Sequence, residues 1–155
     1  MINEKNPRPE PANLMRGFRR NISYHVQMTE KGNISLTGIL HDRYHDIELN
    51  VLVNSDSLEV LDTGLQMRRV PSPHCNDVEK RLELLKGCAI ARGINRKLVE
   101  IFGGSEGCGN LRTMLMGLLP LAVNARAAIG LENEDQMRAV METHLKGTCA
   151  GFPEI

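Results

Sequence analysis

The chain has 155 residues with 41% hydrophobic and 3% aromatic side chains, and 19 Lys and Arg residues balance 19 Asp and Glu residues. This length fits one domain with a sizeable core, while the zero net charge and the few aromatic rings argue against a nucleic-acid partner. Because the sequence has no signal-peptide core and no apolar run of about 18 residues, we expect no membrane association and a cytoplasmic location.

The first half of the chain predicts an antiparallel sheet. Residues 1–15 contain three prolines, so we expect a flexible arm there, followed by a single domain at 16–155. Alternating apolar residues predict four strands, and the short turns EKGN and NSDS indicate a meander with one buried face. A change of phase after Val60 predicts a β-bulge near Gly64. The predicted strands cover residues 18–28, 34–40, 45–53 and 58–67.

The second half predicts about four helices. Ser72 and Pro73 form a helix start. Gly93 is expected inside the second helix as a close packing point, and Pro120 should kink the third. Strands followed by helices indicate an α+β fold, a four-stranded antiparallel meander followed by about four helices packed on one face. The predicted helices cover residues 72–87, about 90–103, 110–130 and 133–147, the last one capped by Asn133.

The glycine-rich segment GGSEGCGNL, residues 103–111, places Cys108 at the start of the third predicted helix. Free backbone N–H groups and the positive end of the helix dipole favour a thiolate there. Gly107 and Gly109 would let the backbone approach a bound cofactor closely. Cys108 is therefore a candidate metal ligand, nucleophile or redox group, although a small residue packed under a tight turn would have the same pattern.

Three other cysteines must be interpreted in a reducing compartment, where metal binding or reactivity is more common than disulfides. Cys75 follows His74 in the first turn of the first predicted helix, and Cys149 lies in the C-terminal tail. Cys88 stands between aliphatic residues and is expected to fill the core.

His45 begins the apolar face of the third predicted strand. Asp42 or Asp46 could orient its imidazole, as metal sites require, although a satisfied core histidine has the same pattern. Three thiolates and an imidazole would suit Zn²⁺ or an iron–sulfur cluster. The cysteine spacings of 33 and 41 residues carry no metal signature, so such a site depends on the fold. The predicted ligands are Cys75, Cys108, Cys149 and, as the fourth donor, His45 or His74.

Two alternatives use other chemistry. In an enzyme, Cys108 would be the nucleophile, His45 or His74 the base, and the glycine-rich amides an oxyanion hole. Met114 and Met116 would then line a pocket for a small acyl or apolar substrate whose identity stays open. In a non-catalytic interaction module, the sheet edge or the last helix would pair with a partner, as in a homodimer.

Several short motifs follow one another along the chain: Asp42 with His45 and Asp46, Pro71 and Cys75, Leu85–Gly87, and Gly107–Cys108 with Leu111. Their order resembles domain-of-unknown-function family twenty-eight eighty-nine, a group of uncharacterised bacterial proteins. The resemblance covers roughly residues 16–128 and implies a shared fold but no activity. Many members have His where this chain has Asn110, so the resemblance assigns no metal to that position. A fainter similarity links the Gly-Cys-Gly helix start to NifU-type iron–sulfur scaffold proteins.

Overall fold

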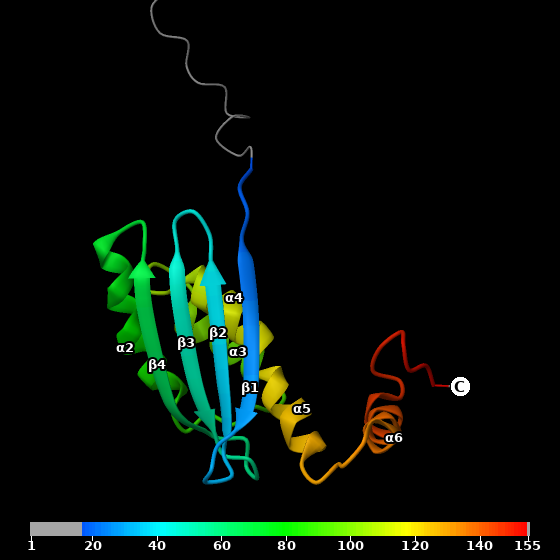
Figure 1. Cartoon of the computed structure of the whole chain (residues 1–155). Helices are drawn as coiled ribbons and strands as arrows, with labels where there is room; N and C mark the ends of the chain where they lie inside the picture. Colours follow the sequence, from blue (N-terminus) through cyan, green and yellow to red (C-terminus); the bar gives the residue numbers. More distant parts are fainter. Residues whose placement is uncertain (1–16, 155) are drawn as a thin grey trace, which may run out of the picture.

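The computed structural model describes residues 17–154, so the arm predicted at residues 1–15 lies outside the described part of the chain. Four antiparallel strands form one sheet in the order β1-β2-β3-β4 (Figure 1). This order confirms the predicted meander. The strands are β1 (Asn21–Met28), β2 (Ile34–His41), β3 (Asp46–Val53) and β4 (Val60–Arg69).

Alternation of apolar and polar side chains gives the sheet one buried face. In β2 and β3, every second residue is buried, from Ile34 to Leu40 and from Ile47 to Val53. The bulge predicted near Gly64 is wrong, because Gly64 pairs regularly with Asn50. The pairing of β3 with β4 instead shifts at two places, where Leu61 and Arg68 are the extra residues of β4. The insertion of Leu61, opposite the step from Leu52 to Val53, causes the change of apolar phase.

The helical half begins with three short pieces in place of one regular helix. The Ser72 side chain accepts a hydrogen bond from the His74 N–H, which confirms the predicted start at Pro73. Gly93 does not lie within the second helix. Its φ of 96° places it in the left-handed region just before that helix, with open space around the missing Cβ. The pieces are η1 (Pro73–Val78), α2 (Glu79–Leu82) and η2 (Glu83–Leu85), followed by α3 (Ile94–Phe102), α4 (Gly109–Leu118), α5 (Pro120–Ala128) and α6 (Glu134–Leu145).

Helices α3, α4 and α5 lie behind the sheet and cover its apolar face, whereas α6 stands apart from it (Figure 1). Met114 and Leu118 of α4 pack on Gly38 at 3.4–3.5 Å from the position of a Cβ, so a larger residue in β2 would separate the layers. A kink is predicted at Pro120, and the structure has a helix boundary at this position, because α4 ends at Leu118 and α5 begins at Pro120. No helix within residues 17–154 is long and apolar enough to cross a membrane.

Candidate functional site

A buried carboxylate organises the turn between β2 and β3. The Asp42 side chain is fully buried, although acidic residues are rarely buried without partners. Its Oδ1 accepts hydrogen bonds from the backbone N–H groups of Tyr44 at 2.7 Å and His45 at 2.8 Å. The His45 ring adds a contact from Nδ1 to the same oxygen at 3.0 Å. The carboxylate therefore fixes both the turn and the orientation of the imidazole.

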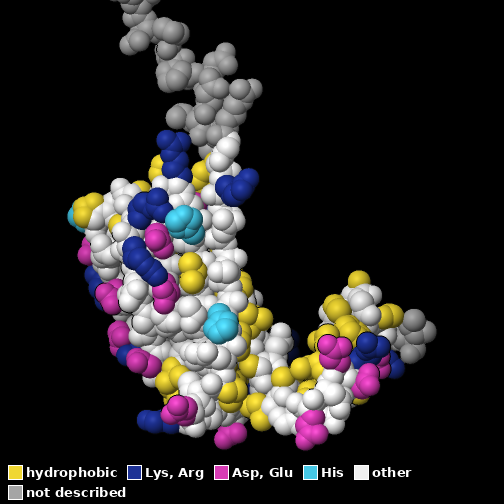
Figure 2. Space-filling view, in the orientation of Figure 1, with side chains coloured by type: hydrophobic (Ala, Val, Ile, Leu, Met, Phe, Trp, Pro, Cys, Tyr) yellow, Lys and Arg dark blue, Asp and Glu magenta, His cyan; other side chains and the backbone are white. Residues whose placement is uncertain are grey.

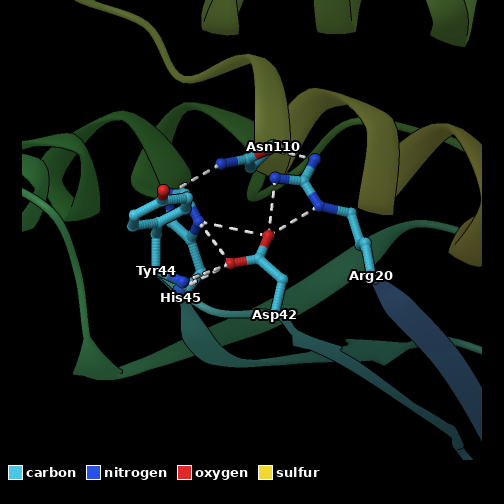
Figure 3. A network of polar contacts seen from close by, with 5 residues as sticks. All are labelled: Arg20, Asp42, Tyr44, His45 and Asn110. Atoms are coloured by element: carbon cyan, nitrogen blue, oxygen red, sulfur yellow. Dashed lines mark hydrogen bonds and ion pairs between the residues drawn. The ribbon is translucent and has the colours of Figure 1, made fainter. Parts of the chain in front are cut away.

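Arg20 and Asn110 complete a closed ring of polar contacts, the Arg20–Asp42–His45–Asn110 ring (Figure 3). The Arg20 guanidinium donates from Nε to Oδ2 of Asp42 at 2.7 Å, and its Nη2 forms an ion pair with the same oxygen at 2.7 Å. Its Nη1 donates to the Asn110 Oδ1 at 2.9 Å. The Asn110 Nδ2 lies 3.1 Å from the His45 Nε2. Each of the four side chains thus contacts two others in the ring.

The ring also assigns the tautomer of His45. Because Arg20 donates to the Asn110 oxygen, the amide NH₂ group of Asn110 must point toward His45. The His45 Nε2 then accepts a hydrogen bond, and Nδ1 carries the proton that it donates to Asp42. Both ring nitrogens are engaged, so His45 would have to release Asn110 before it could bind a metal or accept a proton from a nucleophile.

The ionised form of Asp42 is strongly favoured. Burial would raise the pKa of this carboxyl, but the hydrogen bonds from the Tyr44 backbone, Arg20 and His45 outweigh burial and hold the pKa well below its usual range. Arg20 is the cation that balances the buried charge. The arrangement is that of a structural ion pair whose remaining lone pairs are satisfied by N–H donors.

The ring holds the helix that carries the predicted cysteine. Asn110 is the second residue of α4, and Cys108 is the N-cap of this helix. The preceding loop is tight, because a Cβ on Gly107 would overlap the carbonyl group of Phe102. Arg81 of α2 donates from Nε to the Ile101 carbonyl near the end of α3 at 2.9 Å, and from Nη1 to the Glu106 carboxylate of the loop at 3.3 Å. The position of Cys108 is therefore fixed from both sides of the glycine-rich segment.

Cys75 and Cys108 line the same pocket, which has a volume of about 290 Å³. His74 also lines it, and its Nδ1 lies 3.6 Å from an Asp77 carboxylate oxygen. The walls come from η1, the start of α2 and the loop before α4. The fold therefore brings together two predicted cysteines and one of the two predicted histidines. The pocket is lined by His74, Cys75, Asp77, Val78, Lys80, Ser105, Glu106, Gly107 and Cys108.

The other predicted site residues lie elsewhere. Cys149 is exposed after α6 and forms an isolated bridge with Phe152. Figure 1 places this C-terminal segment on the opposite side of the molecule from α2. Across residues 17–154, no group of three or more His, Cys, Asp or Glu side chains is arranged to hold a metal ion. The four-ligand set of Cys75, Cys108, Cys149 and His45 thus stays a prediction.

Two other expectations, those for Cys88 and Met114, meet an environment that differs from the predicted one. Cys88 is only half-buried, and its Sγ lies 3.4 Å from the Leu84 carbonyl oxygen, so it does not fill the core. Met114 is fully buried and contacts the sheet, which makes it a core residue. Gly109 has open space where a Cβ would lie, so its lack of a side chain leaves the start of α4 accessible.

Comparison with known proteins identifies one relationship. The profile of a family described as proteins of unknown function, DUF2889, matches residues 18–124. No curated protein and no solved structure matches the chain. The matched span contains the sheet, the polar ring and the cysteine pocket, while the fainter likeness to NifU-type proteins finds no support.

Proposed function

The chain belongs to the DUF2889 family of proteins of unknown function, and from its cysteine pocket we propose that it binds a thiophilic metal ion, with Zn²⁺ as the first candidate. The observation that carries the proposal is that Cys75 and Cys108, which are 33 residues apart in the sequence, line one pocket together with His74. Thiolate and imidazole are the donors that zinc prefers in proteins.

The surroundings of His74 support a ligand role for its ring. The side chain is 87% exposed, so it can turn toward the two thiols without disturbing the core. Its Nδ1 faces Asp77, and a carboxylate in that position orients the ring and leaves Nε2 for the metal. In this proposal His74 takes the place of His45, whose two nitrogens are engaged in the polar ring.

The number of donors favours a single zinc ion over an iron–sulfur cluster. A cluster usually takes four cysteine ligands, whereas this pocket offers two. Two thiolates and one imidazole leave a fourth position for water or a substrate, as in catalytic zinc sites. Cys149 is not needed as a ligand.

Elemental analysis tests this proposal on untagged protein purified anaerobically and then titrated with Zn²⁺. We expect near-stoichiometric zinc in the wild type and loss of zinc in Cys75→Ser and Cys108→Ser. Asp77→Asn should weaken zinc affinity by about 10- to 100-fold. Cys88→Ser and Cys149→Ser are matched controls that should retain the metal. Equal zinc in the Cys75→Ser/Cys108→Ser double variant would refute the site.

A cysteine nucleophile is the second candidate, supported by the position of Cys108 at the N-cap of α4 beside the amides of the glycine-rich loop. His74 would then be the base, because it lines the same pocket. This alternative predicts a metal-free protein in which iodoacetamide alkylates Cys108 much faster than Cys149, although Cys149 is the more exposed thiol. His74→Asn should slow that alkylation and leave the rate at Cys149 unchanged.

A further inference from the structure

Two adjoining cavities share a wall in helix α5. The first, the arginine pocket, has a volume of about 480 Å³ and lies between the β3–β4 turn, the segment before α3, and α5. The second, the α5–α6 groove, has a volume of about 580 Å³. Val123 and Arg126 line both cavities, and neither cavity shares a lining residue with the cysteine pocket. The arginine pocket is lined by Arg92, Arg126, Ser57 and apolar residues that include Leu58, Ile90 and Ile94.

The positive charge of the arginine pocket is not balanced by its walls. Arg92 and Arg126 are its only charged lining residues, and neither forms an ion pair with a residue that the structure describes. Arg126 donates from Nη1 to the Asp56 carbonyl at 3.2 Å, and this bond directs its guanidinium toward the β3–β4 turn. The buried side chains of Leu58 and Ile90 lie beside the two cations. Such a pocket suits a carboxylate attached to an apolar body, because each guanidinium offers a fork of N–H donors.

The α5–α6 groove supplies an apolar surface next to these cations. Helix α6 contributes no buried residue to the core, and Met141 in the groove is 40% exposed. Figure 2 shows hydrophobic side chains gathered in this region, between the main body and the C-terminal lobe. No acidic residue lines the groove, and Arg126 and His144 are its only titratable lining residues. The apolar residues that line it are Val123, Ala127, Met137, Val140, Met141 and Leu145.

We propose that the two cavities together bind one fatty-acid anion, with its carboxylate between Arg92 and Arg126 and its aliphatic chain along the α5–α6 groove. Each volume falls within the range of about 300–1,000 Å³ that is usual for small-ligand sites. Charge sets the orientation of the ligand, because Arg92 lines only the first cavity. Arg126 contributes to both parts, its guanidinium to the carboxylate and its aliphatic stem to the groove. The methionine side chains can adapt to a flexible chain.

Isothermal titration calorimetry with dodecanoate tests this site on the full chain, below the concentration at which the probe forms micelles. A chelator keeps zinc from binding the carboxylate. We expect one dodecanoate per chain, and an affinity about tenfold lower in Arg92→Gln and in Arg126→Gln, because each loses a charged hydrogen bond. Arg96→Gln is the matched control, since Arg96 lines neither cavity and pairs with Glu100. Circular dichroism should show the same unfolding transition in all of these proteins, since the three arginines are exposed.

The length and the charge of the probe test the two parts of the site separately. Each buried CH₂ group should contribute about fourfold to the affinity, so decanoate should bind about 15-fold more weakly than dodecanoate. Met141→Glu should weaken dodecanoate binding, whereas Ala139→Glu, an exposed position of α6 outside the groove, should not. Dodecanol, which lacks the charge, should bind more weakly than dodecanoate to the wild type and equally to the Arg92→Gln/Arg126→Gln double variant.

Three results would overturn the proposal. The first is an absence of saturable dodecanoate binding by the wild type. The second is an affinity for dodecanoate that is equal in the wild type and the double arginine variant, or that does not depend on chain length. The third is binding to phosphatidylglycerol vesicles without binding to free dodecanoate, because this would assign the two arginines to a membrane surface.

Discussion

Replacing Asp42 by Asn tests the energetic importance of the polar ring. The amide keeps the size of the carboxylate, and its oxygen can still accept the N–H groups of Tyr44 and His45. On the other side, an NH₂ group would face the Arg20 guanidinium, so hydrogen-bond donors would point at donors. We therefore expect Asp42→Asn to fold with a lower free energy of unfolding.

The size of the loss follows from burial. Removing one partner of a buried ion pair costs about 3–5 kcal/mol. The Asp42 side chain is fully buried, but that of Arg20 is 36% exposed, so water can solvate the unpaired guanidinium in part. Since the retained hydrogen bonds at Oδ1 lower the cost further, we expect a loss of about 2 kcal/mol for Asp42→Asn. Asp42→Ala, which also leaves the turn N–H groups without an acceptor, should lose more.

Urea unfolding followed by circular dichroism measures this loss at pH 7. Asp62→Asn is the control, because it removes an ion pair with Lys86 at the surface and should leave the free energy of unfolding almost unchanged. A loss below about 0.5 kcal/mol for Asp42→Asn, the range of ordinary surface substitutions, would refute the importance assigned to the ring.

The difference in free energy of unfolding between the wild type and Asp42→Asn depends on pH. The pKa of Asp42 is lowered by folding, so the unfolded chain takes up the proton first as the pH falls. The stabilisation by Asp42 is fully present above the unfolded pKa of about 3.9 and is lost as the pH falls toward the folded pKa. The free energy of unfolding of the wild type should therefore approach that of Asp42→Asn as the pH falls. If the difference between the two free energies stays constant down to the pH of acid unfolding, this reasoning is contradicted.

Three further substitutions test the packing. Gly107→Ala should prevent the tight loop, because its Cβ would overlap the Phe102 carbonyl. We therefore expect the rates at which iodoacetamide alkylates Cys75 and Cys108 to differ from those of the wild type. Gly117→Ala would collide with the Tyr24 ring and should lower the free energy of unfolding by about 1–3 kcal/mol, with partial recovery in a double variant that also shortens Tyr24 to Ala. Asn133→Ala removes the N-cap of α6, worth about 1 kcal/mol, and hydrogen exchange should accelerate in α6 alone, because this helix adds nothing to the core.

The sheet was predictable because its signals are local. Alternation in β2 and β3 and the turn before Ile34 specify the strands from neighbouring residues. The helix starts at Pro73 and Glu134 were equally predictable from the sequence, since capping depends on residues one to three positions away. The bulge was misplaced because a phase change shows that an extra residue exists but does not show which strand position it occupies.

The polar ring was only half predictable. His45 and its two candidate carboxylates are near in sequence, but the choice of Asp42 over Asp46 depends on the turn geometry. Arg20 and Asn110 are 90 residues apart, and no local pattern joins them. The resemblance to DUF2889 gave the only signal, because it grouped Asp42, His45 and position 110 in one motif order without assigning them to one network.

For the cysteines too, local sequence patterns do not show which distant residues meet in the fold. Cys75 and Cys108 share a pocket because η1 and the loop before α4 meet in space, a contact that no spacing rule specifies. Cys149 was grouped with them by residue type, yet it follows a helix that lies away from the sheet. Residue chemistry identified the candidates, whereas the packing of the helices decided which of them can act together.

The order of strands before helices also affects how the chain is synthesised. Once Arg69 has left the ribosome, all four strands exist, but α4, which packs on Gly38 in the middle of the sheet, is not complete until Leu118. Those 49 residues require about 2–10 s at about 5–20 residues per second. During that interval the nascent chain exposes a row of aliphatic side chains, so ribosome-bound chaperones are expected to bind it most strongly at these lengths and to release it when α4 emerges.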